Sequence, residues 1–337
     1  MTARSASAGR RLGTAICVLL ATLVLCGPWL VANGPEQQFV DFIYAPPMRP
    51  HVIDSSGALR FPFVYPLVLE NRLEHRFTED HTRIVTVRLF RGGRLLSVDP
   101  AATTPWFPLG ADALGRDQLA RLAWGARLSL GVALAAACGA LVIGANVGAI
   151  AGFAGGALDD LLMRVSDFVI ALPAVYVVLA LRASMPLVLT ISQVFWTMAG
   201  VLALVGWPVA ARGVRAVVAA ERGREYAEAA RAIGASRTRL LLRHLVPAAR
   251  GFLVVQATLL VPAFVLAEAT LSYVGLGFAE SIPSWGVMLR EAGQGRAFVD
   301  APWLFAPALA IALSTLAINL VAGAHARTRR TTLNEMT

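Results

Sequence analysis

The feature that most constrains this chain is a series of apolar runs long enough to cross a lipid bilayer as helices. A helix rises about 1.5 Å per residue and the hydrocarbon core is about 30 Å thick, so about 20 apolar residues are needed. Helices also satisfy their own backbone hydrogen bonds, which lipid cannot do. We therefore predict an all-α polytopic membrane protein with six transmembrane helices, at residues 12–32, 128–153, 161–181, 187–211, 248–273 and 303–324.

The composition supports a membrane protein and excludes several functions. Hydrophobic residues make up 57% of the 337 residues, charged residues make up 15%, and the mean hydropathy is +0.63. Cys17, Cys26 and Cys138 all lie inside apolar runs, where a thiol behaves as a small hydrophobic group, so we expect no disulfide and no metal site. All 30 basic residues are arginine. Since a phosphate-binding P-loop requires lysine, the chain cannot be an ATPase of that type.

Positive charge between the fourth and fifth runs predicts the orientation. Short arginine-rich loops are retained in the cytoplasm, and nine arginines occur within residues 212–250. We place this connection in the cytoplasm and, with six spans, both termini there too. Residues 1–33 then form a cytoplasmic tail and the first transmembrane helix, 34–106 form an extracytoplasmic segment, and 326–337 form a cytoplasmic tail. The net charge of +9 is thus an orientation signal, and we expect contact with membrane lipid and no nucleic-acid partner.

The outer segment 34–106 has the pattern of a small β-structured insertion. The stretch RIVTVRLFRGGRLLSVDP reads as two strands joined by a tight turn at the Gly pair 92–93, so we predict a β-hairpin. A passive spacer and a surface for a partner protein both remain open as its role. Beyond the insertion, we expect Asp112 to cap a helix that carries Arg116 and Arg121 along the membrane surface.

The arginine-rich cytoplasmic connection has the pattern of a bent pair of helices. Residues 220–233 favour helix, Gly234 interrupts it, and Ser236 can cap a second helix that runs to Pro247. Alanines leave the first helix with little bulk on one side, so a partner can approach its backbone closely, and Glu228 is the acidic residue there. An ordinary solvated loop rich in retention charge is the alternative, and the residue types alone leave both interpretations open.

A motif in this connection resembles that of a known family. Glu228-Ala229-Ala230, three residues, Gly234, nine residues and then HLVP are similar to the EAA signature of the membrane subunits of binding-protein-dependent ABC importers. Over residues 107–320 the stretches PLGADALGRD, FAGGALDDLLMRVSDFVIALP, AEATLSYVGLG and PSWGVML occur in the order found in the dipeptide and oligopeptide branch of that family. After Asn319 the chain departs from the branch, because LVAGAHARTRR replaces its usual ending.

The resemblance implies a type I ABC importer permease fold, with a transmembrane core at 107–325 and a coupling helix at 221–236 that transmits movement from a separate ATPase subunit. The coupling residues it implies are Glu225, Tyr226, Glu228, Ala229, Ala230, Gly234, Ala235 and Ser236. The implied partners are ABC ATPase subunits that bind ATP and Mg, a second homologous permease subunit and an extracytoplasmic solute-binding protein, all at the bacterial inner membrane. This chain itself is expected to hold no cofactor and no catalytic residue.

An ionisable residue inside a predicted span is a candidate for function, since a charge at membrane depth is costly. Glu268 lies toward the outer end of the fifth predicted span and is followed by Ser272 and Tyr273. We predict that these three residues line the translocation path or its outer gate, where the carboxylate would meet the amino group of a peptide. A helix-end residue bonded to backbone or solvent is the alternative.

Three functions are compatible with these patterns. The first is the membrane subunit of an ATP-driven importer of di- or oligopeptides, with nickel chelates or glutathione as alternative substrates. The second is an ion-coupled secondary transporter in which Glu268 or Asp167 carries the proton. The third is a receptor or scaffold that works through the outer segment. We expect no enzyme activity, because the five histidines show no metal-ligand spacing.

Overall fold

The computed structural model describes residues 3–334 apart from 55–57, 73, 92–93, 99–103, 174–175, 178–179, 181–188 and 295–299. By its internal packing the chain forms two units. Unit 1 comprises Met1–Gly13, Leu130–Glu268 and Thr315–Thr337, and unit 2 comprises Thr14–Ser129 and Ala269–Ser314.

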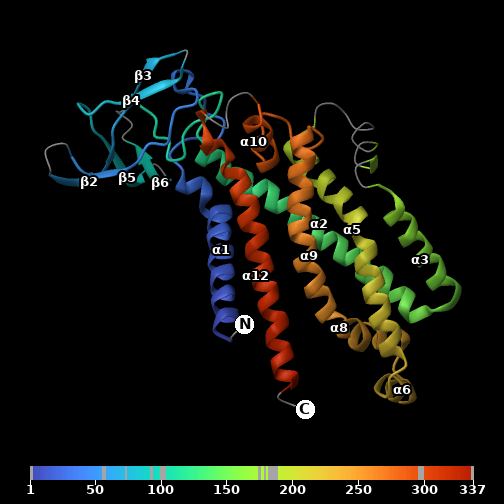
Figure 1. Cartoon of the computed structure of the whole chain (residues 1–337). Helices are drawn as coiled ribbons and strands as arrows, with labels where there is room; N and C mark the ends of the chain where they lie inside the picture. Colours follow the sequence, from blue (N-terminus) through green and yellow to red (C-terminus); the bar gives the residue numbers. More distant parts are fainter. Residues whose placement is uncertain are drawn as a thin grey trace. The chain divides into compact units, whose positions relative to one another are not determined.

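Helices dominate the described residues, as the apolar runs predict (Figure 1). The α-helices are α1 (Ala3–Leu30), α2 (Gln118–Ala154), α3 (Gly156–Ala171), α5 (Ile191–Arg222), α6 (Glu225–Ala232), α7 (Arg237–Leu240), α8 (Val246–Ala248), α9 (Arg250–Val274), α10 (Trp285–Ala292) and α12 (Ala306–Asn334). Short 3-10 helices occur at η1 (Val40–Phe42) and η3 (Pro302–Phe305), and a π-helical turn occurs at η2 (Leu241–Leu245).

Four helical stretches among the described residues are long and apolar enough to cross a membrane. They are Gln118–Ala154, Ile191–Arg222, Arg250–Val274 and Pro302–Ala322, and they coincide with the second, fourth, fifth and sixth predicted spans. Helix α1 contributes a shorter apolar stretch, Arg11–Gly27. A mostly helical chain with helices able to cross a membrane is therefore confirmed, whereas the count of six spans stays a prediction.

The third predicted span, 161–181, is not one continuous helix. Helix α3 ends at Ala171, and Leu172 is extended with ψ 124°. The following residue is Pro173, and a proline ring disfavours helical backbone at the residue before it. Most of the remaining part of this predicted span lies outside the described residues.

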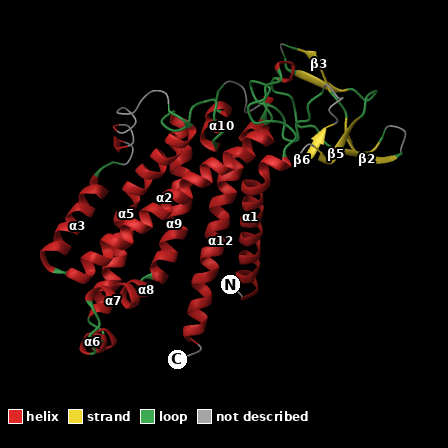
Figure 2. Ribbon diagram, turned by 180° about the vertical axis from the view of Figure 1, so that it is seen from behind, coloured by secondary structure: helices red, strands yellow, loops and turns green. Residues whose placement is uncertain are grey.

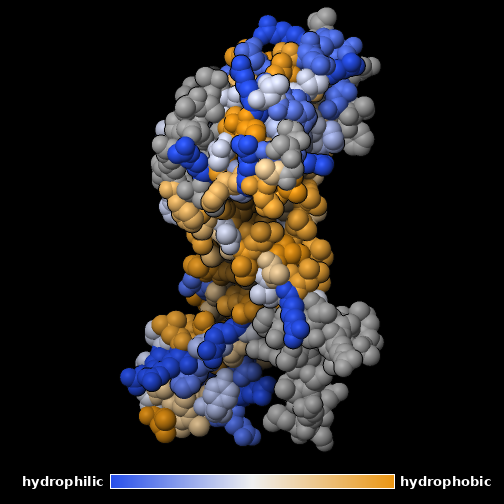
Figure 3. All heavy atoms as spheres, turned by 90° about the vertical axis from the view of Figure 1, so that its left-hand side faces the viewer, coloured by the Kyte–Doolittle hydropathy of each residue, from blue (hydrophilic) through white to orange (hydrophobic). Residues whose placement is uncertain are grey.

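Exposed apolar side chains on these helices provide a surface suited to lipid. Leu134 and Val142 of α2 and Val254 of α9 are each more than half exposed. Figure 3 shows hydrophobic side chains gathered over the helices and hydrophilic side chains over the strand-bearing part of unit 2. Apolar side chains that would be costly to expose to water are stable against acyl chains, so this distribution fits an integral membrane protein.

In unit 1, glycines bring α2 and α5 into close contact. A Cβ atom added to Gly144 would lie 2.7 Å from the carbonyl oxygen of Trp207, and one added to Gly152 would lie 2.6 Å from that of Arg215. Gly148, between them, faces α5 at still closer range. Small residues at a spacing of four allow two helix backbones to approach in this way, so the α2 glycines serve assembly, as their spacing indicates.

Ion pairs attach α3 to α5 within unit 1. Asp159 of α3 binds the guanidinium of Arg215, with an Oδ2–Nη2 distance of 2.6 Å, and Asp167 pairs with Arg212. The hydrogen bond from Arg215 lowers the pKa of the Asp159 carboxyl below its usual range. Both acids thus tie α3 to α5, the helix that leads into the arginine-rich connection.

Six strands of unit 2 lie in the segment 34–106, for which the sequence predicts a single β-hairpin (Figure 2). An antiparallel four-stranded sheet has the order β1-β2-β5-β6, and a separate pair joins β3 and β4. The bounds are β1 His51–Ile53, β2 Leu59–Val64, β3 Leu67–Asn71, β4 Arg76–Glu79, β5 Val85–Arg91 and β6 Arg94–Val98. The two strands predicted around 92–93 are β5 and β6, which pair antiparallel, while 92–93 lie outside the described residues.

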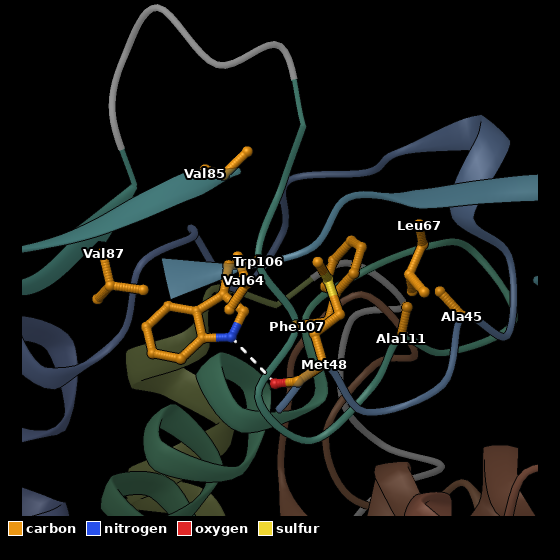
Figure 4. Close-up of a cluster of buried hydrophobic side chains, with 9 residues drawn as sticks. All are labelled: Ala45, Met48, Val64, Leu67, Val85, Val87, Trp106, Phe107 and Ala111. Atoms are coloured by element: carbon orange, nitrogen blue, oxygen red, sulfur yellow. Dashed lines mark hydrogen bonds between the residues drawn. The ribbon is translucent and has the colours of Figure 1, made fainter. Parts of the chain in front are cut away.

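A compact hydrophobic cluster supports these strands (Figure 4). Val64, Val85 and Val87 from the strands pack with Met48 and with Trp106, whose indole Nε1 donates a hydrogen bond to the Met48 carbonyl oxygen at 3.1 Å. Phe107 and Ala111 belong to the same cluster. The cluster thus includes residues on both sides of the boundary predicted between 106 and 107, and that boundary stays a prediction.

Helix α2 begins differently from the expectation. Asp112 does not cap it; the carboxylate of Asp117 accepts a hydrogen bond from the backbone N–H of Leu119 at 2.9 Å and so performs that role. Asp117 is fully buried, and burial raises the pKa of its carboxyl to about 6 even though Asn33 also donates a hydrogen bond to it. Arg116 and Arg121 are buried too and do not lie on a membrane surface.

Candidate docking site

Helix α6 of the arginine-rich connection has one buried face and one exposed face. Ala227 and Ala230 are buried, and they pack with Val214 and Val218 of α5 and with Ala149 of α2. Small side chains are needed at these two positions because the helix lies directly on its neighbours. Figures 1 and 2 show α6 beyond the end of α5, close to α7 and α8, all within unit 1.

The opposite face of α6 is open to a partner. Glu225, Tyr226, Glu228 and Ala229 are exposed. The Glu228 carboxylate makes no hydrogen bond or ion pair with any residue that the structure describes. Tyr226 donates its hydroxyl to Oε2 of Glu221 at 2.9 Å, and burial together with this acidic neighbour raises the pKa of the phenol. The exposed face therefore presents two carboxylates, a phenol and the small side chain of Ala229.

The bend after α6 has the form that the sequence predicts. Gly234 has φ +87°, a left-handed conformation that favours glycine, and nothing lies within 4 Å of a Cβ built there. The N–H of Ala235 donates to the carbonyl oxygen of Ala230 at 3.0 Å, which closes the end of α6. The hydroxyl of Ser236 accepts from the N–H of Arg239 at 3.3 Å and caps α7, as expected.

Two arginines bind the connection to the helix ends. Arg222, the last residue of α5, donates from Nη1 to the carbonyl oxygen of Phe153 near the end of α2 at 2.6 Å. Arg231 of α6 donates from Nη2 to the carbonyl oxygen of Arg222 at 3.1 Å. These hydrogen bonds connect α6 to the end of α5, and the end of α5 to the end of α2.

The second group of predicted residues lies on α9. Glu268 is fully buried, Ser272 is fully buried one turn further on, and Tyr273 is half exposed. Ser272 and Gly286 both belong to unit 2 and lie close together, since a Cβ on Gly286 would be 2.7 Å from the Ser272 Cβ. Glu268 and Ser272 thus share a side of the helix, whereas Tyr273 points elsewhere.

Unit 2 contains a buried network of charges that residue patterns did not reveal. Asp112 Oδ2 lies 2.7 Å from Nε of Arg116 and 2.5 Å from Nη1 of Arg121. Glu291 of α10 binds both guanidiniums, with an Oε1–Nη2 distance of 3.1 Å to Arg116. The spacing of Asp112 and Arg116 could have indicated one pair, but Glu291 is far along the chain and gives no local signal. The network fixes α10 to the start of α2.

No group of three or more histidine, cysteine, aspartate or glutamate side chains suited to a metal ion occurs among the described residues.

A family model described as binding-protein-dependent transport system inner membrane component matches residues 144–328, which is more than half of the chain. The chain belongs to this family. The matched range includes α5, α6 and α9.

Known members of the family resemble the chain over most of its length. The oligopeptide transport system permease protein OppC of Bacillus subtilis is 38% identical over 229 residues, which is 67% of this chain and 72% of that protein. The dipeptide transport system permease protein DppC of the same organism is 36% identical over 223 residues, covering 66% and 67%. The di/tripeptide transport system permease protein DppC of Pseudomonas aeruginosa is 31% identical over 313 residues, covering 92% and 83%. The similarity to such permeases thus extends well beyond the EAA-like motif.

Proposed function

We propose that this family member is a permease subunit of an ATP-driven ABC importer, which translocates di- or oligopeptides delivered by an extracytoplasmic binding protein across the bacterial inner membrane. The observation that carries the proposal is the geometry of α6. Its alanine face is seated on α5 and α2, and its exposed face holds Glu228, which pairs with no residue in the described part of the chain. The relatives named as peptide permeases support the substrate class.

In this function the exposed face of α6 receives the ATPase subunit. The residues proposed for coupling are Glu225, Tyr226, Glu228, Ala229, Ala230, Gly234, Ala235 and Ser236. Ala230 acts from the buried face by holding α6 on α5, and Gly234 and Ser236 act by fixing the bend. ATP and Mg belong to the ATPase, so this chain supplies no catalytic residue and holds no cofactor.

In this proposal, movement of α6 reaches α5 and then α2 through contacts between residues that the structure describes. Displacement of α6 moves Ala227 and Ala230 against α5, and the Arg231 and Arg222 hydrogen bonds act in the same direction. The close α2–α5 packing then carries α2 along with α5. Rigid-body movement of packed helices about a central site is the physical form of alternating access.

The orientation and the remaining partners follow from the same proposal. The α6 connection and both termini are cytoplasmic, and the strand-bearing insertion and α10 are extracytoplasmic, where the binding protein docks. A second homologous permease subunit completes the pathway. We propose that Glu268, Ser272 and Tyr273 line this pathway, with Glu268 shielded until the partner permease is present.

Peptide uptake by cells that carry the operon with variants of this chain tests the proposal. Glu228→Lys and Gly234→Pro are expected to leave the protein in the membrane, abolish uptake and release the ATPase on purification. Asp160→Lys, an exposed charge reversal on α3, is the matched control and should transport normally. Normal uptake and normal ATPase retention in both α6 variants would falsify the docking role.

The energy source separates the proposal from secondary transport. Uptake should fail when cellular ATP is depleted and persist when the ion gradient alone is collapsed. The reverse result would point to proton carriage by Glu268 or Asp167. Competition of labelled dipeptide uptake by oligopeptides, nickel chelates and glutathione then identifies the preferred substrate.

A further inference from the structure

A cavity of about 590 Å³ lies beside α6 in unit 1. Three arginines line it, Arg222, Arg231 and Arg237, together with apolar groups that include Phe153 and Leu240. None of the lining residues is acidic, and the structure describes all of them. The volume lies within the range of about 300–1,000 Å³ that is usual for small-molecule sites. The cavity therefore combines ligand-sized space with positive charge of a single sign.

Within the described part of the chain, no acidic side chain forms an ion pair with the three cavity arginines, and Asp159, which interacts with Arg222 through space, is ion-paired with Arg215. The bonds that Arg222 and Arg231 make are to neutral carbonyl oxygens, of Phe153 and of Arg222 respectively. The Arg237 side chain makes no ion pair or hydrogen bond with any described residue. Glu221 of α5 pairs with Arg224, and Glu225 and Glu228 lie on the exposed face of α6 and do not line the cavity. Several guanidinium N–H donors therefore remain available, and their planar fork matches the oxygens of a phosphate group.

The position of the cavity indicates where such a phosphate comes from. Ala154 is the last residue of α2 and Arg222 is the last residue of α5, and both helices are apolar enough to span a membrane. Lipid headgroups begin where such apolar helices end, and basic pockets at that level bind anionic headgroups. The apolar walls at Phe153 and Leu240 suit the glycerol portion of the lipid.

We propose that this cavity binds the phosphate-bearing headgroup of an anionic phospholipid. A bound headgroup bridges the end of α2, the end of α5 and the α6 bend, so it stabilises the connection at the point where movement is transmitted. A free phosphate ester shares the recognition chemistry but has no acyl chains to keep it at the membrane surface.

Lipid binding by the full-length chain, purified with its copurifying subunits, tests the site. Native mass spectrometry would count bound short-chain phosphatidylglycerol, with phosphatidylcholine as the zwitterionic comparison and glycerol phosphate as the soluble one. Arg237→Gln should weaken phosphatidylglycerol binding by about fivefold, as expected for the loss of one cation at a lipid surface. Arg243→Gln removes the same charge from an exposed site outside the cavity and should change binding by less than about twofold.

Selective retention of phosphatidylglycerol that is lost in Arg237→Gln and kept in Arg243→Gln supports the site. Equal loss in the two variants would overturn it, since general surface charge would then explain the binding. Glycerol phosphate binding as tightly as the lipid would assign the cavity to a soluble phosphate ester. An effect of Arg237→Gln on ATPase retention with no effect on lipid binding would assign it to an acidic protein group.

Discussion

A Cβ atom on Gly148 of α2 would collide with the carbonyl oxygen of Ala211 in α5. No side chain fits between these two residues, so the two helices touch through their backbones. Under the proposed function, this contact would carry α2 along with α5 when α6 moves.

Gly148→Ala is therefore expected to destabilise the protein by about 1–3 kcal/mol, the usual range for overpacking a close contact. Gly200→Ala is the matched control, since nothing lies within 4 Å of a Cβ at Gly200 of α5. Thermal unfolding of the purified protein should show a lower melting temperature for Gly148→Ala only. Equal melting temperatures in the two variants would contradict the close approach.

Two glycines that flank α6 provide a second pair of test and control variants. Gly234 and Gly223 both have open space where an added methyl group would lie, but φ is +87° at Gly234 and −91° at Gly223. Gly234→Ala should cost about 1–2 kcal/mol because of the left-handed backbone, whereas Gly223→Ala should have little effect. Faster hydrogen exchange of the α6 amides in Gly234→Ala checks this, and unchanged exchange would show that the bend tolerates a side chain.

The charge network of unit 2 predicts that substitutions of two glutamates near α10 will differ greatly in their effect on stability. Glu291→Gln leaves the buried guanidiniums of Arg116 and Arg121 undercompensated, which is expected to cost about 3–5 kcal/mol. Glu280→Gln removes an exposed partner of Arg290 and should cost less than about 1 kcal/mol. Chemical denaturation of the two variants distinguishes these values, and similar midpoints would mean that the network contributes no net stability.

Asp117 predicts a pH dependence of stability. Its pKa in the folded protein is about 6, above the unfolded value of about 3.9. A raised pKa means that the folded state holds the proton more tightly. This contribution is therefore fully present below about pH 4 and is lost as the pH rises through about 6, with a total of about 3 kcal/mol. Melting temperatures at about pH 5 and about pH 7.5 should differ less in Asp117→Asn than in wild type.

The exposed Asp41→Asn is the control for that experiment, because it makes the same chemical change outside the core. Its melting temperatures should follow those of the wild-type protein at both pH values. If Asp117→Asn and Asp41→Asn show the same pH dependence, then the buried carboxyl of Asp117 does not titrate in this range.

Local patterns were sufficient to predict the bend after α6 and the cap of α7. Gly234 and Ser236 act through their own backbone and the next few residues, so residue type alone predicts the bend and the cap. The long apolar helices were predictable for the same reason. The two faces of α6 were not, because the burial of Ala227 and Ala230 depends on α5 and α2, which are distant in sequence.

Tertiary contacts explain the predictions that were wrong. Asp112 resembles a helix cap, but its carboxylate is taken by Arg116 and Arg121, and Asp117 caps α2 instead. The sequence around Arg116 and Arg121 is typical of an interfacial helix, but both guanidiniums bind Glu291, which is distant in the sequence. In the third predicted span, Pro173 is a local signal that α3 ends just before it. The prediction of a continuous helix followed the length of the apolar run and gave this proline too little weight.

Photocrosslinking from the exposed face of α6 tests the docking role most directly. A photoreactive phenylalanine would be placed at Ala229 and, as the matched control, at Ala279, which is also exposed and is proposed to lie on the extracytoplasmic side. In intact cells, position 229 should yield an adduct with the ATPase subunit and position 279 should not. An intact complex with no ATPase adduct at 229, or an adduct there with the exported binding protein, would contradict the docking of an ATPase on α6.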